Sequence, residues 1–457
     1  MDKFFGISNS GSSVRTEILA GFTTFFTMAY IMFVNPSLLS ETGMSWSGVF
    51  VATVIAAAVG TLVMGLAANV PYAVAPGMGM NAFFTYTVCF GIGFKWQEAL
   101  AIVFICGIIN IIITVTKLRK AIIMAIPKSL QLAIGGGIGL YIAYIGLING
   151  GIIQFGAVPT LTHFNEITME GVRNLDPILA VTGLVITIVL LMLKVKGALL
   201  IGIIAATLIG IPMGITQIPE KIFTTGVLSG IKDVSFAFFG EVGLKSLFSD
   251  GRAYIALITI FAFSLTDTFD TIGTFIGTGR KSGIFDFNDE KAHIKGFKTK
   301  MDKALFADAT ATSVGALFGT SNTTTYIESA SGISEGGRTG FTSVIVAVLF
   351  LICIPLVSIF GMAPSAATSP ILIIVGVLMA ESFAGINWKE LDEAIPAFFT
   401  VMIMIFAYNI SYGIAFGFIS YCIVKVCKKQ VKEVNPIMFG AALLFIFYFV
   451  LMAVNHL

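Results

Sequence analysis

The chain has 457 residues, of which 56% are hydrophobic and only 11% are charged, and its mean hydropathy is +0.95. Soluble domains carry about 25% charged residues, so this composition excludes an ordinary soluble domain and predicts a multi-pass protein of the cell membrane. The formal net charge of +2, with no long basic block, gives no indication of a nucleic-acid partner.

In chain order, residues 1–16 come first; they lack a cleavable signal pattern and are expected to be a cytoplasmic N-terminus. Apolar runs long enough to cross about 30 Å of hydrocarbon then follow one another. These runs are 17–40, 46–68, 96–116, 129–149, 175–193, 197–215, 253–277, 303–319, 340–360, 367–384, 391–408, 409–426 and 435–455. Loops rich in Lys and Arg are expected in the cytoplasm, and they place the N-terminus there too. They are 117–128, 194–196, 280–303 and 425–432.

Two further stretches, 72–90 and 320–336, are too polar or too rich in Gly and Pro for ordinary lipid-facing helices. Irregular backbone at membrane depth is tolerated where it is buried in protein or lines a cavity. Each stretch is the third segment of its half if the halves begin near Glu17 and Arg252. Interrupted segments at matching positions indicate the substrate site of an inverted-repeat transporter.

This reading divides the chain into two seven-span repeats, 17–215 and 252–426, joined by an extracellular connector, 216–251. A weak likeness between KGALLIGIIAATLIG and YGIAFGFISYCIV, each in the last span of its half, supports the division. Residues 427–457 then form a C-terminal segment, and its apolar run either spans the membrane or lies at the interface.

The segment FAFSLTDTFDTIGTFIG carries Asp267 and Asp270 in an otherwise apolar run. A charge at bilayer depth costs roughly 2.5 kcal/mol or more, and residues three apart share a helix face. Two close carboxylates in a dry site cannot both ionise cheaply, so one is expected to bind a proton that couples to substrate binding. The alternative is that these two acids form a structural ion pair with Lys or Arg, but basic residues lie only near the ends of the spans.

In the second interrupted stretch, the polar run Ser321–Thr325 has β tendency and precedes Glu328. The pattern predicts an extended piece that leads into a helix start, where free N–H groups suit electron-rich ligand atoms. Thr324, Thr325 and Glu328 are therefore candidate binding residues. The alternative is that the hydroxyls only satisfy the backbone of a broken helix, with Glu328 as a helix-start charge.

The first interrupted stretch contains the sequence PGMGMN, which supplies flexible backbone and the amide of Asn81. This amide both donates and accepts, so it can recognise a neutral heterocycle, and Gly79 allows close approach. A Gly-rich helix crossing is the alternative explanation. Thr27, in the first span, is a further candidate, although threonines there often bond back to their own helix. Asp308 and Glu381 are single carboxylates in apolar runs, and Asp308 is either a proton relay or a charge near a loop.

No cofactor is expected. The five cysteines show no metal-ligand spacing, and the histidines, His163, His293 and His456, lie in loops or at the tail, so no metal site is predicted. The coupling ion is expected to be a proton, with Na⁺ as the alternative.

Four motifs resemble the adenine/guanine/hypoxanthine permease branch of the nucleobase–cation symporters, in the nucleobase–ascorbate transporter superfamily. They are GFTTFFTMAYIMFVNP, APGMGMNAFF, DTFDTIGT and TSNTTTYIESASGISEGGRTG, and the resemblance covers nearly the whole chain. It implies an all-α membrane protein with the uracil-permease fold, in which 14 segments form two inverted seven-span repeats. It also implies short strands in segments 3 and 10, and core and gate domains that move against each other.

By the same resemblance, the eighth span binds the base through an acidic residue. The pattern Asp270-Thr271-Ile272-Gly273 favours Asp270 over Asp267, with Glu328 in the tenth span and Asn81 in the third. The family often has Glu or Gln earlier in the tenth span, where this chain has Thr320, Ser321 and Asn322. Asp267, Asp270 and Glu328 are the candidates for proton coupling.

The resulting hypothesis is a secondary active transporter that imports hypoxanthine, guanine or adenine by proton symport through alternating access. Fold analogy alone suggests a homodimer. An inorganic anion transporter of the same fold is the first alternative, but it would favour a cation near the half-helices, and Arg338 lies past their end. A membrane enzyme is disfavoured because no nucleophile–base pair is evident, and a channel would lack saturable uptake.

Overall fold

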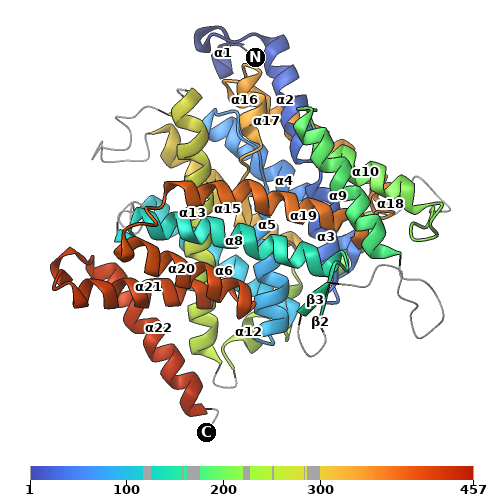
Figure 1. Ribbon diagram of the computed structural model, residues 1–457. Helices are drawn as coiled ribbons and strands as arrows, with labels where there is room; N and C mark the ends of the chain where they lie inside the picture. The colour runs from blue at the N-terminus through green and yellow to red at the C-terminus, as the bar shows by residue number, and fades with distance from the viewer. Residues whose placement is uncertain are drawn as a thin grey trace.

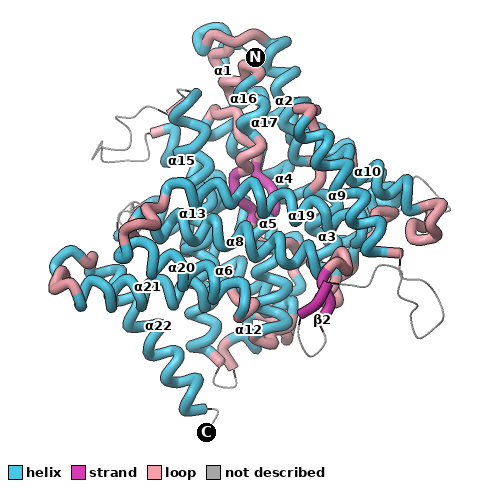
Figure 2. Tube along the Cα trace, in the orientation of Figure 1, coloured by secondary structure: helices cyan, strands magenta, loops and turns pink. Residues whose placement is uncertain are grey.

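The architecture comes from a computed structural model, which describes residues 2–116, 125–155, 159–161, 175–219, 227–249, 252–282, 284–285 and 299–455. The chain is almost entirely helical, with two small two-stranded sheets (Figures 1 and 2). In hydrocarbon, helices satisfy their own backbone hydrogen bonds, which explains why the apolar runs adopt this conformation. Most of the basic loops expected at 117–128 and 280–303, and all three histidines, lie outside the described residues.

The first half of the chain supplies helices at each of the apolar runs expected there. They are α2 (Val14–Met28), α3 (Ile31–Ser40), α4 (Trp46–Val63) with a π-helical end η2 (Met64–Ala68), α6 (Trp96–Val115), α8 (Lys128–Asn149), α9 (Asp176–Met192) and α10 (Ala198–Gly210). Side-chain caps fix several starts; Ser13 accepts from the Thr16 N–H and Ser45 from the Gly48 N–H. A short N-terminal helix, α1 (Asp2–Phe5), precedes them.

The second half of the chain is also built from helices at the expected apolar runs. Its helices are α13 (Ala253–Ser282), α15 (Lys300–Phe318), α17 (Gly340–Ile352), α18 (Val357–Phe360), α19 (Ser365–Met379) with a 3₁₀ end η6 (Ala380–Gly385), α20 (Leu391–Phe406) and α21 (Ile410–Cys427). The run at 435–455 forms α22 (Pro436–Asn455), which packs on α21 and projects from the body (Figure 1).

The segment between the repeats contains short helices. They are α11 (Val227–Val234), η4 (Ala237–Phe239) and α12 (Leu244–Leu247). Val234, Phe238 and Leu247 are buried whereas Phe236 and Phe239 are exposed, which fits the amphipathic character of this stretch. Strands β2 (Ile153–Phe155) and β3 (Pro159–Leu161) pair as a hairpin after α8.

Six of the described helices are long and apolar enough to cross a membrane, or seven if the bent pair Gly340–Ile352 and Ile354–Phe360 counts as one span. Four shorter apolar helices accompany them: Asp176–Met192, Ala198–Gly210, Ala253–Thr268 and Pro436–Val450. The structure therefore establishes a multi-pass helical membrane architecture, while the number 14 stays a prediction.

The helices pack as two groups. The core group contains α2, α3, α4, α6, α13, α15, α17 and the two interrupted segments, and the gate group contains α8, α9, α10, α19, α20 and α21. Within the gate group, α8 and α19 run side by side across the front of the molecule in Figure 1. The expected division into a core and a gate agrees with this packing.

Both interrupted segments are broken as the sequence predicts. The first contains β1 (Val74–Pro76), α5 (Met78–Ala82) and the π-helical η3 (Phe83–Gly91), and the second contains β4 (Thr323–Thr325) and α16 (Ser329–Ser334). Short strands in the third and tenth segments are thus confirmed. The two strands are the magenta pair in the middle of the molecule in Figure 2.

Candidate functional site

The two interrupted segments meet at a short antiparallel ladder. Strand β1 pairs with β4 in the register Val74↔Thr325, Ala75↔Thr324 and Pro76↔Thr323. The Gly77 N–H donates to the Asn322 carbonyl at 2.9 Å and continues the ladder at one end. Because these backbone groups lie in the interior, each needs a protein partner, and the pairing of the two crossings supplies it.

Threonines on two neighbouring helices complete this backbone pairing. Thr61 of α4 donates to the Val74 carbonyl at 3.0 Å and accepts from the Val74 N–H at 2.9 Å. Thr312 of α15 donates to the Thr323 carbonyl at 2.9 Å. Both side chains are fully buried. The two helices occupy corresponding positions, one before each broken crossing, so the contacts support the idea of a structural repeat.

Asp270 and Glu328 approach the ladder from different elements. The Asp270 carboxyl, on α13, lies within hydrogen-bonding reach of the Thr324 side chain and close to the carboxyls of Asp308 and Glu328. Glu328 precedes α16 and accepts a 2.5 Å hydrogen bond from the Tyr30 hydroxyl. Both acids are half-buried, whereas Thr324 is only 2% exposed. Two partly exposed carboxyl groups therefore lie beside the ladder, each with a hydroxyl partner from another element.

Two tyrosines border these acids. Tyr30 comes from the turn between α2 and α3, and Tyr326 follows β4 and donates to the Pro76 carbonyl at 2.6 Å. Their ring centroids are 6.5 Å apart, and the two planes are inclined by 44°. The site thus combines carboxylates with aromatic surface, and hydroxyls and backbone groups from both crossings lie beside them.

Asp267 has a different environment. It is fully buried, and its Oδ2 accepts from the Asn110 amide of α6 at 2.6 Å, while the Asn110 carbonyl accepts from the Ser264 hydroxyl. The acidic neighbours of Asp270 are Asp308 and Glu328. The two carboxylates of α13 therefore face different elements: Asp267 bonds to α6, and Asp270 lies against β4.

The other predicted residues are distributed unevenly around the ladder. Asn81 is fully buried, and neither its amide nitrogen nor its carbonyl oxygen has a hydrogen-bond partner among the described residues. Thr325 donates to Asp308 at 2.9 Å. Thr27 donates to the carbonyls of Thr23 and Thr24 in its own helix. A Cβ on Gly79 would lie 2.6 Å from Ile138 of α8, so this glycine allows close approach between the core and gate groups.

The sequence left the role of Asp308 open between a proton relay and a charge near a loop. It is fully buried on α15, and it accepts from the Thr271 hydroxyl at 2.8 Å and from the Thr325 hydroxyl at 2.9 Å. These threonines directly neighbour Asp270 and Thr324. In the sequence, FADATATS places this carboxylate among small residues, but the pattern does not identify its hydrogen-bond partners.

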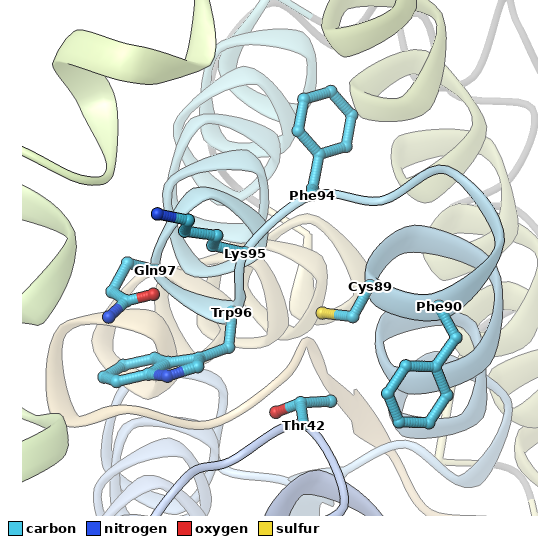
Figure 3. A pocket seen from close by; sticks show the side chains of 7 residues that line it. All are labelled: Thr42, Cys89, Phe90, Phe94, Lys95, Trp96 and Gln97. Atoms are coloured by element: carbon cyan, nitrogen blue, oxygen red, sulfur yellow. The ribbon is translucent and has the colours of Figure 1, made fainter.

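Arg338 forms hydrogen bonds with the backbone at and just after the end of α16, where its guanidinium donates to the carbonyls of Ile333 and Gly337 at 2.6 and 2.8 Å. Within the described ranges, no group of three or more His, Cys, Asp or Glu residues could hold a metal ion. A hollow of about 290 Å³ lies elsewhere, at the ends of η3 and α6, and is lined by Cys89, Phe94 and Trp96 among others (Figure 3). It has no carboxylate in its lining, so we place the candidate site at the ladder.

Comparison with known proteins defines the class. Residues 15–416 match a model described as the Permease family, and the chain belongs to this family of multi-pass membrane transporters. It is 40% identical to the adenine permease AdeP of Escherichia coli K12, over 98% of this chain and 95% of that protein. It is 42% identical to the guanine/hypoxanthine permease PbuO of Bacillus subtilis 168, over 96% and 98% of the two chains.

A solved structure shares the fold. The transmembrane domain of the cyanobacterial bicarbonate transporter BicA matches with a TM-score of 0.62 at 15% identity, over 87% of this chain and 97% of that domain. At this level of identity the likeness concerns architecture alone. The chain is therefore a permease rather than an enzyme.

Proposed function

We propose that this permease imports purine nucleobases (hypoxanthine, guanine or adenine) by proton symport, with Asp270 and Glu328 as the principal ligands of the base. The observation that carries the proposal is the pair of half-buried carboxyl groups beside the ladder of the two broken crossings. Relatives named as adenine and guanine/hypoxanthine permeases match this chain over nearly its full length.

The chemistry of the site suits a flat, neutral guest. A carboxylate can accept two N–H groups from guanine, one from the ring and one from the exocyclic amine. The amide of Asn81, which has no partner in the described part of the chain, can pair with a carbonyl oxygen or a ring nitrogen. Buried polar atoms would stay unpaired with an analogue that lacks those groups, so such a site discriminates strongly.

Proton coupling follows if a carboxyl group exchanges its proton between the two orientations of the transporter. Asp270, Glu328 and Asp308 lie close together, and like charges in a confined space favour protonation of one of them. A proton bound there lowers the cost of burying the site together with its neutral guest. Asp267, bonded to Asn110, is a less direct candidate for this step.

The test is uptake of radiolabelled hypoxanthine, guanine and adenine by cells that lack their own purine permeases. Asp270→Asn and Glu328→Gln should each reduce uptake at least tenfold, because each removes a charged hydrogen-bond acceptor worth about 1.5–3 kcal/mol. Asp392→Asn, at a surface carboxylate paired with Lys428, is the matched control and should transport normally. Uptake at the wild-type rate by both site variants would reject the assignment.

Coupling is tested with the same cells. A protonophore, which collapses both the pH gradient and the membrane potential, should abolish accumulation of the base above its external concentration. Accumulation that depends on Na⁺ and persists with the protonophore would assign the coupling ion to Na⁺. An anion transporter would instead show thermal stabilisation of the purified protein by sulfate and none by purines. The guanidinium of Arg338 donates to backbone carbonyls, and this argues against its serving as the cation of an anion site.

A further inference from the structure

The core and gate groups are joined by polar contacts at opposite ends of the molecule. At one end, Glu41 and Tyr86 of the core group contact Asn149, the last residue of α8 in the gate group. At the other end, Lys196, between α9 and α10, pairs with Glu335 at the end of α16. The first contact lies beside the start of α9, where Gly150 and Gly151 approach Ala180 and Pro177, whereas Lys196 follows the far end of this 17-residue helix.

The contact at the first end is a small closed network. The Tyr86 hydroxyl donates to Glu41 Oε1 at 3.0 Å, and the Asn149 amide donates to Tyr86 at 2.7 Å and to Glu41 at 3.3 Å. Tyr408, at the junction of α20 and α21, lies edge-on to Tyr86, with ring centroids 5.6 Å apart. Three gate elements therefore meet the ends of α3 and η3 at this point.

The contact at the second end is a single ion pair. Lys196 Nζ lies 2.5 Å from Glu335 Oε1, and the two side chains are 63% and 33% exposed. Exposed pairs of this kind contribute little to stability. It is therefore easily broken and re-formed, which suits a contact that has to separate in a reaction cycle and not one that holds a fold together.

We propose that Glu41, Tyr86 and Asn149 form a latch between the core and gate groups, and that the Lys196–Glu335 pair is its counterpart at the opposite end. The inference rests on the proposed transport function, in which the two groups move against each other. Opening the ligand site toward one side separates the groups at that side, so the contacts there have to break. Both contacts are closed in this structure, which corresponds to a state shut at both ends.

A native thiol lies beside the latch and can report its opening. Cys89, one turn beyond Tyr86 in η3, is 8% exposed and lines the hollow of Figure 3 together with Thr42, the neighbour of Glu41. Its sulfur faces Trp96 and Thr42 across the hollow (Figure 3). The Tyr86–Glu41 hydrogen bond joins η3 to the end of α3, which border this hollow from two sides, so access to the thiol increases when the latch opens and this bond breaks.

The first experiment measures maleimide alkylation of Cys89 in the purified protein. The background carries Cys427→Ser, which removes the exposed thiol, and Cys353→Ser and Cys422→Ser, because these two thiols are 8% exposed like Cys89. Asn149→Ala and Tyr86→Phe should each speed alkylation about threefold to tenfold, the factor expected for loss of one hydrogen bond. Asn387→Ala, an amide in an exposed turn at the other end of α8, is the matched control and should leave the rate unchanged. Unchanged rates in both latch variants would overturn the proposal.

The second experiment holds the latch shut. Glu41→Cys and Asn149→Cys, introduced together with Cys89→Ser and Cys427→Ser, are joined by a short bis-maleimide in proteoliposomes. Cross-linking should abolish hypoxanthine uptake, whereas each single-cysteine variant treated in the same way should keep it. Cross-linked protein that transports at the single-variant rate would refute the latch. If the wild type takes up no purine, the proposed function fails, while the alkylation rates still report on the latch.

Discussion

Asp308 links the two elements that carry the candidate ligands. Its two carboxylate oxygens accept one hydroxyl from α13, next to Asp270, and one from β4, next to Thr324. Neither bond involves a substrate directly. The carboxylate instead fixes the distance between the acid of α13 and the ladder, and a group of this kind positions others without touching the guest.

We therefore expect Asp308→Asn to weaken purine uptake tenfold or more while the protein still inserts and folds. An amide can accept only one of the two hydroxyls well, so one threonine loses a charge-assisted bond worth about 1.5–3 kcal/mol. Kinetics of labelled hypoxanthine uptake, with Thr271→Val and Thr325→Val in a double-mutant cycle, measure the effect. Thr310→Val, at a hydroxyl that donates to the Phe306 carbonyl of its own helix α15, is the control, and an equal loss there would contradict a positioning role.

At the scale of elements, the central ladder depends on partners outside the strands. Thr61 and Thr312 are on the helices that precede the two broken crossings, and each supplies a hydroxyl to a strand. Gly60, beside Thr61, also allows α4 to approach α15, because a Cβ there would lie 2.6 Å from the Ala311 side chain. The strands are therefore held by a pair of closely packed helices as well as by each other.

Replacing Thr61 by Val should destabilise the protein by about 2 kcal/mol, because the Val74 N–H and carbonyl would lose a partner in the interior. Thr312→Val should have a similar but smaller effect, since it removes one bond. The measurement is the midpoint of thermal aggregation in detergent. Thr207→Val offers a control of the same chemistry, because that hydroxyl has no partner among the described residues. A midpoint lowered equally by all three variants would disprove the role of the ladder.

The broken crossings and their strands could be predicted from the sequence, because Pro, Gly and a run of threonines disfavour a continuous membrane-spanning helix. The pairing of the two strands with each other was not predicted, although it satisfies backbone groups that would be costly to leave unpaired in the interior. The hydrogen-bond partners of the individual acids could not be predicted from the sequence. Asn110 and Asp267 are 157 residues apart, and the register between α6 and α13 that joins them is a result of packing. The same holds for Asp308, whose hydroxyl partners come from two different elements.

At the scale of the whole molecule, Glu41 makes the latch sensitive to pH. It lies just beyond the first span. Although the residue as a whole is exposed, the surrounding protein desolvates part of its carboxyl group and raises the pKa above the usual 4.5, an effect that hydrogen bonds from Tyr86 and Asn149 partly offset. Tyr408 is the other titratable group that faces it. A raised pKa in the closed state means that protonation favours closure. The closed latch is thus most stable at low pH and loses stability as the pH rises through the raised pKa.

Glu41→Gln should remove this dependence, since the amide is neutral at every pH and still offers an acceptor to Tyr86. Alkylation of Cys89 in the wild type should match that of Glu41→Gln at pH 4.5 and exceed it increasingly toward neutral pH. Comparing the two proteins at each pH cancels the titration of the thiol itself. A constant ratio across this range would show that Glu41 does not titrate with the latch.

The ladder between β1 and β4 also bears on how substrate preference changes over evolution. Its bonds join main-chain atoms, so they persist when the side chains of Thr324 or Asn81 are exchanged. Side chains around the guest can therefore change during evolution while the backbone pairing that positions them is kept. For the same reason, an engineer who wants a permease for a modified base should vary the residues beside the strands and leave Thr61 and Thr312 untouched.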